Sequence, residues 1–337
     1  MPTPRKPTPR KAAFKTVDLP TLKFESDRRI PLIVLAVIAA LMAIVLVFTQ
    51  CKGPATTAPD DAQPVSSEEV APEAEEIEPV EPPTNPSARA SLAEYSWEEL
   101  SEISAKIAKA TSSSDVTYIA RQYNLVDDTG ALDGAATKTV SLADGTTAQV
   151  RIIGFNHDSA SDGSGKAGIT FMFADGVTSM AFNEDGSNTG GWPASSASYY
   201  LGVQLYNLLP QDLASAIVEV KKKTQADSGT TVVETGDIIW LPSYIELTGQ
   251  VDPELQNALS TLQQEGSQYQ LFADAGVSAS GNNSLLVMHD GSQASAWWLR
   301  SIDTNSDNTF YYVNAAGHPT NGGDASSDYL MVPCFSV

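Results

Sequence analysis

The chain has 337 residues, with 20 Lys and Arg against 41 Asp and Glu, which gives a formal net charge of −21 at pH 7. The charge is uneven, because residues 1–29 carry a net +5 and the rest of the chain therefore carries −26. A body this acidic repels nucleic-acid phosphates and anionic lipid headgroups, so both are excluded as its partners. The length admits one large domain or two smaller ones.

An uninterrupted apolar segment comes after the basic tail. Residues 31–48 contain no charged or strongly polar side chain, and as a helix they span about 27 Å, enough to cross a bilayer. Arg28 and Arg29 precede the segment, which predicts a transmembrane helix over residues 30–50 with residues 1–29 in the cytoplasm. A cleaved signal peptide typically has a shorter apolar stretch, and a lipoprotein signal has small residues, rather than Gln50, before its cysteine. We therefore expect a single-pass protein of the cell membrane with an extracellular C-terminal part.

Residues 51–88 have the composition of an acidic, proline-rich linker. Proline stiffens such a segment and like charges extend it, so we expect it to hold a folded head away from the membrane. The chain has only two cysteines, Cys51 and Cys334, with no Cys-x-x-Cys motif or Cys/His cluster for a metal. An external domain without paired cysteines suits a bacterium.

A helical hairpin is predicted over residues 89–125. Ser96 and Glu99 form a capping box at the start of the first helix. Apolar side chains then recur at helical spacing in both helices: Trp97, Leu100, Ile103 and Ile107, then Val116, Ile119 and Tyr123. The hairpin is too small to fold alone, so we expect it to pack against the C-terminal part of the chain.

Residues 126–337 alternate between strand and helix patterns, which predicts an α+β domain with a mixed or antiparallel sheet and flanking helices. A helix over residues 209–223 is predicted from its apolar positions Leu213, Ile217 and Val220, with three lysines at its C-terminal end. The predicted strands are residues 138–142, 148–155, 168–174, 237–241, 295–301, 309–315 and 329–337, and helical structure is expected over residues 197–210 and 242–247.

Three short motifs invite a chemical interpretation. The phosphate-loop-like GSGKAG at residues 163–168 lacks the first glycine and the final Ser/Thr of that motif. Residues 303–308 (DTNSDN) have the spacing of calcium ligands but lack the Gly and the bidentate Glu, so a hairpin connection is favoured there, and residues 183–192 are interpreted as a loop in the same way. His157 and Asp158 follow a predicted strand and form either a cleft pair or a hydrogen-bonded turn.

The aromatic segment 296–317 contains the most suggestive residues. Alternation along a strand places Trp297 with Leu299 on one face and Trp298 with Arg300 on the other. Arg300 is the only Lys or Arg after Lys223, so we expect it to pair with a carboxylate or to stack over Trp298. It is either a structural clamp or a ligand anchor.

The blocks VRIIGFNHD, GSGKAGITFMFAD, GGW, LLPQDLASAIVEVKKKT, IIWLPSYIEL, EGSQYQLF, WWLRS and VPCFSV occur in this order. Together they resemble a domain of unknown function, number 6273, of surface and membrane-anchored proteins of Gram-positive bacteria. The resemblance covers residues 148–336, and its closing strands are similar to a C-type-lectin-like architecture. Two departures stand out, SASYYLG where the family's helix often bears an arginine and LMVPCF at the end. The family has no assigned activity, so the resemblance implies none.

The expected function is binding or display, namely recognition of a glycan, peptide or cell-wall component through an aromatic cleft. The candidate ligand-binding residues are Trp298, Arg300, Trp192, Tyr311, His157 and Asp158. One alternative is a cell-envelope enzyme that uses His157 with Asp158, and another is a structural module that assembles with a second envelope protein. No metal, cofactor or nucleic acid is expected.

Overall fold

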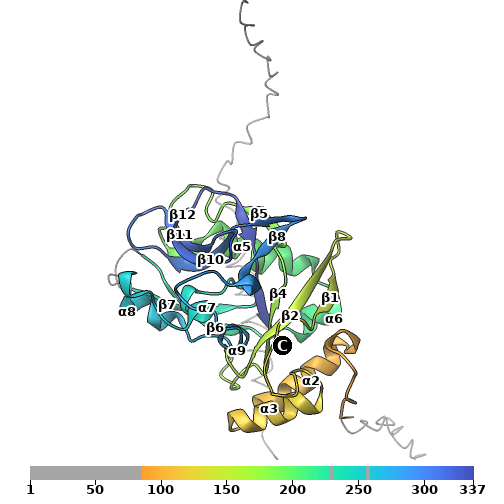
Figure 1. Ribbon diagram of the computed structural model, residues 1–337. Helices are drawn as coiled ribbons and strands as arrows, with labels where there is room; N and C mark the ends of the chain where they lie inside the picture. Colours follow the sequence, from red (N-terminus) through yellow and green to blue (C-terminus); the bar gives the residue numbers. More distant parts are fainter. Residues whose placement is uncertain (1–84, 228–230, 256–258) are drawn as a thin grey trace, which may run out of the picture. The chain divides into compact units, whose positions relative to one another are not determined.

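The computed structural model describes residues 85–337, apart from residues 228–230 and 256–258. These residues belong to one compact unit (Figure 1). Within them, no helix is both long enough and apolar enough to cross a membrane. The predicted transmembrane helix over residues 30–50, and the linker up to residue 84, lie outside the described residues.

The first sheet joins early strands to the end of the chain. Its order is β1-β2-β4-β14, and every neighbouring pair is antiparallel. The strands are β1 (Lys138–Ser141), β2 (Thr147–Phe155), β4 (Ile169–Phe173) and β14 (Cys334–Ser336). The predicted strands over residues 138–142, 148–155 and 168–174 are therefore confirmed. The C-terminal strand completes the sheet, because Val337 donates its backbone N–H to Ile169.

The second sheet is mixed, as expected for the α+β class. Its order is β12-β11-β10-β13-β5, in which β10 and β13 run parallel and the other pairs antiparallel. The strands are β12 (Pro319–Asp324), β11 (Thr309–Val313), β10 (Trp297–Ile302), β13 (Tyr329–Met331) and β5 (Thr178–Met180). The predicted strand over 329–337 is divided between the two sheets, with Pro333 between its halves, because proline has no N–H to donate to a ladder.

Two smaller sheets and a set of short helices complete the described fold. The sheets are β3 (Ser159–Ala160), β6 (Val220–Gln225) and β7 (Val232–Asp237), in the order β3-β6-β7, and β8 (Met288–Asp290) with β9 (Gln293–Ser295). The α-helices are α2 (Trp97–Ala108), α3 (Ser113–Gln122), α4 (Gly191–Ala194), α5 (Ser196–Tyr199), α6 (Gln211–Ala216), α7 (Tyr244–Thr248), α8 (Leu259–Leu262) and α9 (Gln270–Asp274). The 3₁₀ turns are η1 (Leu92–Glu94), η3 (Tyr206–Leu208), η4 (Pro253–Leu255), η5 (Gln263–Glu265) and η6 (Ser284–Leu286), and η2 (Tyr200–Leu205) is a π-helix.

The predicted helical hairpin is confirmed as α2 and α3, which Figure 1 shows together beside the C-terminus. The capping box is formed, because Ser96 accepts the N–H of Glu99 and Glu99 accepts that of Ser96. Trp97 packs edge-on against Phe171 and Phe335, with ring centres 5.4 and 5.8 Å apart. The hairpin therefore shares the hydrophobic core of the first sheet.

The predicted helix over residues 209–223 is confirmed only in its first part. The helix α6 ends at Ala216, and the three lysines lie in β6, where side chains alternate between buried and exposed. Every second side chain of this strand is buried, namely Val220, Lys222 and Thr224. Lys222 can be buried because two carboxylates pair with it in the interior. The neighbouring predicted strand over 237–241 is also displaced, since β7 ends at Asp237 and Trp240 makes only an isolated bridge to Cys334.

Candidate functional site

The predicted tryptophans lie in one buried aromatic cluster. The rings of Trp192 and Trp298 both pack against Phe182, with ring centres 6.2 and 5.5 Å away. Their indole N–H groups are also engaged, since Trp192 donates to Asp237 at 2.9 Å and Trp298 donates to the backbone of Met180 at 3.1 Å. Both side chains are fully buried, so they stabilise the second sheet and present no face to a ligand.

Tyr311 has a different aromatic neighbour. Its ring packs against Tyr244 of α7 at 4.8 Å, and its buried hydroxyl makes no hydrogen bond to any described residue. Burial raises the pKa of Tyr311 well above its ordinary value, with Asp303 contributing. The phenol is therefore a neutral core side chain.

Arg300 pairs with a carboxylate, which confirms one of its two expected partners. Its Nη2 donates to Oε1 of Glu246 at 3.0 Å, and its Nη1 donates to Oε2 of the same carboxylate. Backbone carbonyls of Leu241 and Glu265 accept further bonds, at 2.9 and 3.0 Å. The strand alternation is interrupted by a register shift between Trp298 and Ile302. Arg300 therefore clamps β10 to α7 and η5.

Asp158 supplies a second buried carboxylate beside this pair. The Lys222 ammonium lies 2.7 Å from Oδ1 of Asp158 and 2.5 Å from Oε1 of Glu246. It also lies over the ring of Trp240, 4.8 Å from the ring centre. Burial alone would raise the pKa of Asp158, but Lys222 and His157 outweigh it and hold that pKa far below its usual range. Asp158 and Arg300 are thus brought together through Lys222 and Glu246.

His157 has contacts that resemble a hydrolytic triad in residue type. Its Nδ1 lies 3.1 Å from Asp158, and its Nε2 lies 3.1 Å from the hydroxyl of Ser267. However, Nε2 lies closer, at 2.8 Å, to the backbone carbonyl of Ser267, an acceptor that requires a proton on Nε2. In this arrangement the imidazole cannot accept the hydroxyl proton, and it ties the β2–β3 connection to the 266–269 segment.

Glu265 is the remaining acid in this part of the core. Its carboxylate accepts the N–H of Gln225 at 3.0 Å and the hydroxyl of Ser301. Burial raises its pKa to about 7, although the charge of Arg300 opposes the shift. We name the set Asp158, Lys222, Glu246, Arg300 and Glu265 the interior charge network.

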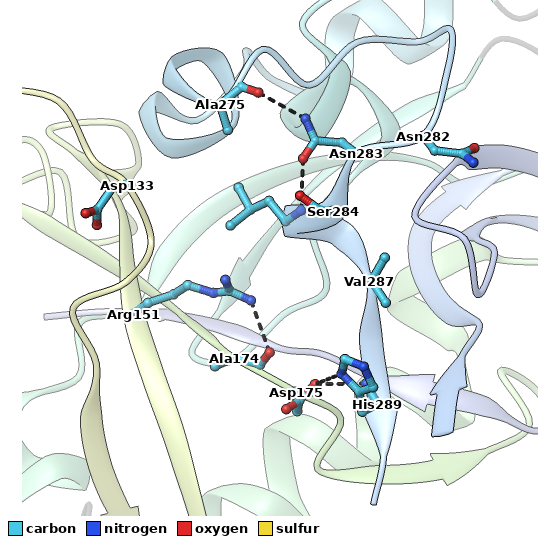
Figure 2. A pocket seen from close by; sticks show the side chains of 11 residues that line it. Asp133, Arg151, Ala174, Asp175, Ala275, Asn282, Asn283, Ser284, Val287 and His289 are labelled. Carbon is cyan, nitrogen blue, oxygen red and sulfur yellow. Dashed lines mark hydrogen bonds and ion pairs between the residues drawn. The ribbon is translucent and has the colours of Figure 1, made fainter. Parts of the chain in front are cut away.

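A large open cavity lies elsewhere, on the surface between β2, β8 and η6. It has a volume of about 660 Å³, within the range typical of small-ligand sites. Figure 2 shows its lining residues, and we name it the Arg151 pocket: Asp133, Arg151, Ala174, Asp175, Ala275, Asn282, Asn283, Ser284, Leu285, Val287 and His289. It brings together stretches of the chain that are far apart in the sequence.

Arg151 is the unusual member of this lining. It belongs to the buried strand β2, and only 9% of the residue is exposed. Its Nη2 donates to the carbonyl of Ala174 at 3.0 Å, while its Nε has no hydrogen-bond partner among the described residues. No described carboxylate lies within ion-pair distance of the guanidinium, and burial lowers its pKa, with Asp175 opposing from further away. Arg151 is thus a buried cation without an ion-pair partner in the described residues.

The polar side chains elsewhere in the lining are held in place by hydrogen bonds. Asp175 accepts the backbone N–H of His289 at 2.8 Å, and its carboxylate lies 3.4 Å from the imidazole Nδ1 (Figure 2). Asn283 donates to the carbonyl of Ala275 at 3.0 Å and accepts the N–H of Leu285 at 2.9 Å, which fixes the turn that enters η6. These hydrogen bonds fix part of the pocket wall and do not use Arg151.

Sequence reasoning missed these pocket residues. The available signal was Arg151 itself, a lone charge inside the apolar strand sequence VRIIGF. The partners across the pocket, such as Asp133 and His289, lie in loops and short strands far away in the chain, and no spacing pattern connects them.

The family model for the domain of unknown function 6273 (DUF6273) matches residues 168–337. The match covers half of the chain. The chain belongs to this family. No curated protein and no solved structure matches it. The match begins later than the predicted residue 148, so the VRIIGFNHD block precedes it.

The DUF6273 boundary divides both sites. In the interior charge network only Asp158 precedes the matched region, whereas Lys222, Glu246, Glu265 and Arg300 lie within it. In the pocket, Asp133 and Arg151 precede the match, and Asp175, His289 and the 282–284 turn lie inside it. The pocket therefore needs the strand and loop that come before the family domain. The C-type-lectin-like likeness stays a prediction.

Proposed function

We propose that this DUF6273 protein is a membrane-anchored surface protein of a bacterium whose folded head binds a carboxylate-bearing ligand in the Arg151 pocket. The anchor is the apolar segment 31–48, and the acidic linker up to residue 88 separates it from the head. Recognition rather than catalysis is favoured, because the imidazole of His157 is engaged by a backbone carbonyl.

One observation supports the ligand site above the others. A buried charge without a partner is costly, and it is retained in folded proteins where a ligand, a metal or a functional step uses it. Arg151 is nine-tenths buried, lines the pocket and has no ion-pair partner among the described residues. A guanidinium binds carboxylates in a bidentate geometry, and such charge-assisted bonds are among the strongest available.

The interior charge network does not offer the same opportunity. Each of Lys222 and Arg300 already has a carboxylate partner inside the protein, and the side chains are 3% exposed or less. A ligand would have to displace those partners and open the core. The proposed binding surface is therefore the pocket and not the residues around Trp298.

A binding measurement with a simple carboxylate probe tests the proposal. The full-length chain in detergent is titrated with trialanine, followed by calorimetry and by NMR shifts of the arginine side chains. We expect Arg151→Gln to weaken binding at least about tenfold, because a charge-assisted pair is lost. The control is Arg121→Gln, which removes the same charge from an exposed helix position on α3. Equal binding by both variants would rule out Arg151 as the anchor.

The proposed location has its own test. Protease treatment of intact cells is expected to release the head by cutting within residues 51–88, while a tag on residues 1–29 stays protected until the cells are lysed. A matched strain with Leu41→Arg and Val45→Arg disrupts the apolar segment and is expected to lose membrane association. Recovery of the unmodified chain in the cytosol would contradict the location.

A further inference from the structure

We infer that the Arg151 pocket takes a zwitterionic ligand, namely a short peptide with small apolar side chains and free ends. Its carboxylate lies at Arg151, and its ammonium is attracted to the acidic side chains of the lining, Asp133 and Asp175. This inference rests on the proposed function, and it adds the second charge and the chemical class of the ligand.

The charges of the lining carry the inference. Besides Arg151, the pocket is lined by two carboxylates, Asp133 and Asp175, and by no lysine. Both aspartates are exposed, and neither lies within 4 Å of a described lysine or arginine nitrogen. With histidine counted as neutral, the charged residues of the lining sum to −1. A ligand with only a carboxylate would therefore meet one attractive and two repulsive groups, whereas the ammonium of a zwitterion is attracted to the acidic groups.

The surrounding field favours the same class. Everything beyond residue 29 carries a net charge of −26. A field of this sign repels anionic ligands during approach and lowers their local concentration. A ligand with no net charge avoids that penalty, and its ammonium end is attracted to the acidic rim. The ligand that suits an unpaired buried arginine in such an acidic protein therefore carries a positive charge in addition to its carboxylate.

The remaining lining suits a peptide backbone. The Asn282 amide and the Ser284 hydroxyl line the pocket from exposed positions. Such groups can pair with the N–H and C=O groups of a peptide. The apolar part of the wall consists of Ala174, Ala275, Leu285 and Val287. These side chains match small apolar groups such as the methyl of alanine.

Three matched probes separate the two charges. Trialanine carries both charges, N-acetyl-trialanine carries only the carboxylate, and trialanine amide carries only the ammonium. We expect the two blocked peptides to bind the full-length protein at least about tenfold more weakly than trialanine. Equal binding of trialanine and its N-acetyl form would overturn the zwitterion inference and leave the carboxylate site at Arg151 intact. If none of the three peptides binds the full-length protein, the proposed function is contradicted as well.

Variants of the aspartates complete the test. Asp133→Asn with Asp175→Asn is expected to bring trialanine down to the affinity of its N-acetyl form while leaving the N-acetyl form unchanged or tighter. Asp290→Asn is the control, because it removes one exposed carboxylate next to the pocket without being part of its lining. A loss in the control half as large as that in the double variant, on a logarithmic scale of affinity, would show that net charge, and not the two aspartates, governs binding.

Discussion

Two buried arginines in this protein have opposite surroundings. Two guanidinium nitrogens of Arg300 donate to the carboxylate of Glu246, and the same nitrogens donate to backbone carbonyls. The residue is fully buried in the core. Arg151 is 9% exposed, donates to one carbonyl at 3.0 Å and lines an open cavity. In the amino-acid sequence the two look alike, because each is a lone arginine among apolar residues of a strand.

The difference lies in what the rest of the chain supplies. Arg300 is neutralised by a capping-box glutamate, since Glu246 also accepts the N–H of Ser243 at the start of α7. The described residues supply no carboxylate to Arg151 within ion-pair distance, although Asp175 lies at the same cavity. A paired arginine stabilises the fold and leaves no room for a ligand, whereas an unpaired one gains from binding one. Burial alone therefore does not separate structure from function.

The largest expected effect is on the paired side of this comparison. Glu246→Gln leaves Lys222 and Arg300 buried with their shared carboxylate removed, which is expected to lower the free energy of unfolding by about 3–5 kcal/mol. Urea unfolding followed by tryptophan fluorescence measures the loss. Glu234→Gln is the matched control, because Glu234 pairs with Lys221 at the surface, 3.4 Å away, and such pairs contribute at most about 1 kcal/mol. Equal stability of both variants would show that the interior charge network does not stabilise the fold.

A second prediction concerns pH and the same network. Burial raises the pKa of Glu265 to about 7 from an ordinary value of 4.5. Between these two values the folded chain keeps a proton that the unfolded chain has released. The free energy of unfolding therefore falls as the pH rises through this window, by up to about 1.4 kcal/mol per pH unit from this group. Below the window both states are protonated, and above it both are ionised.

Unfolding at pH 5, 6 and 7 tests this slope. Glu265→Gln keeps a neutral side chain in place of the protonated acid, so the variant is expected to lack the decline that the unmodified protein shows. All other titratable groups are the same in both proteins, so their contributions cancel in the comparison. Glu246 acts at lower pH: burial opposes its charge, but Arg300 and Lys222 lower its pKa to about 2. Its contribution is present above about pH 4.5 and is lost as the pH falls toward 2. Parallel profiles for the two proteins would contradict an acid of raised pKa at position 265.

Local patterns predicted much of the fold, and they failed in the segment from residue 217 to residue 241. The capping box at Ser96, the strand alternation of β2 and the aromatic strands β10 and β11 follow from spacing, and the structure confirms them. The failure at residues 217–223 came from the three lysines, which suggest the end of an exposed helix. Their true place in β6 depends on Asp158 and Glu246, two residues that are distant in the chain and close only after folding.

The candidate site was less accessible to sequence reasoning for the same reason. A carboxylate partner for Arg300 could be predicted from its isolation among acidic residues, and the structure confirms it. The burial of Trp298 could not be predicted, because it depends on the register shift in β10 and on packing against the ring of Phe182. The pocket depends on loops that meet across the chain, from Asp133 to His289, and loop geometry leaves no periodic trace.

The smallest expected change in stability sharpens the comparison from the unpaired side. Arg151→Met removes a buried charge whose Nη2 donates to the carbonyl of Ala174 at 3.0 Å and to the sulfur of Met288 at 3.8 Å, and methionine retains the apolar stem. The lost hydrogen bond contributes about 1 kcal/mol, and relief of the desolvation penalty offsets it, so the free energy of unfolding is expected to change by less than about 1 kcal/mol.

The same variant is expected to lose trialanine binding. Addition of trialanine should raise the unfolding midpoint of the unmodified protein and leave that of Arg151→Met unchanged, because only a ligand that binds the folded state stabilises it. A loss of several kcal/mol without ligand would instead place Arg151 with Arg300, as a second structural clamp.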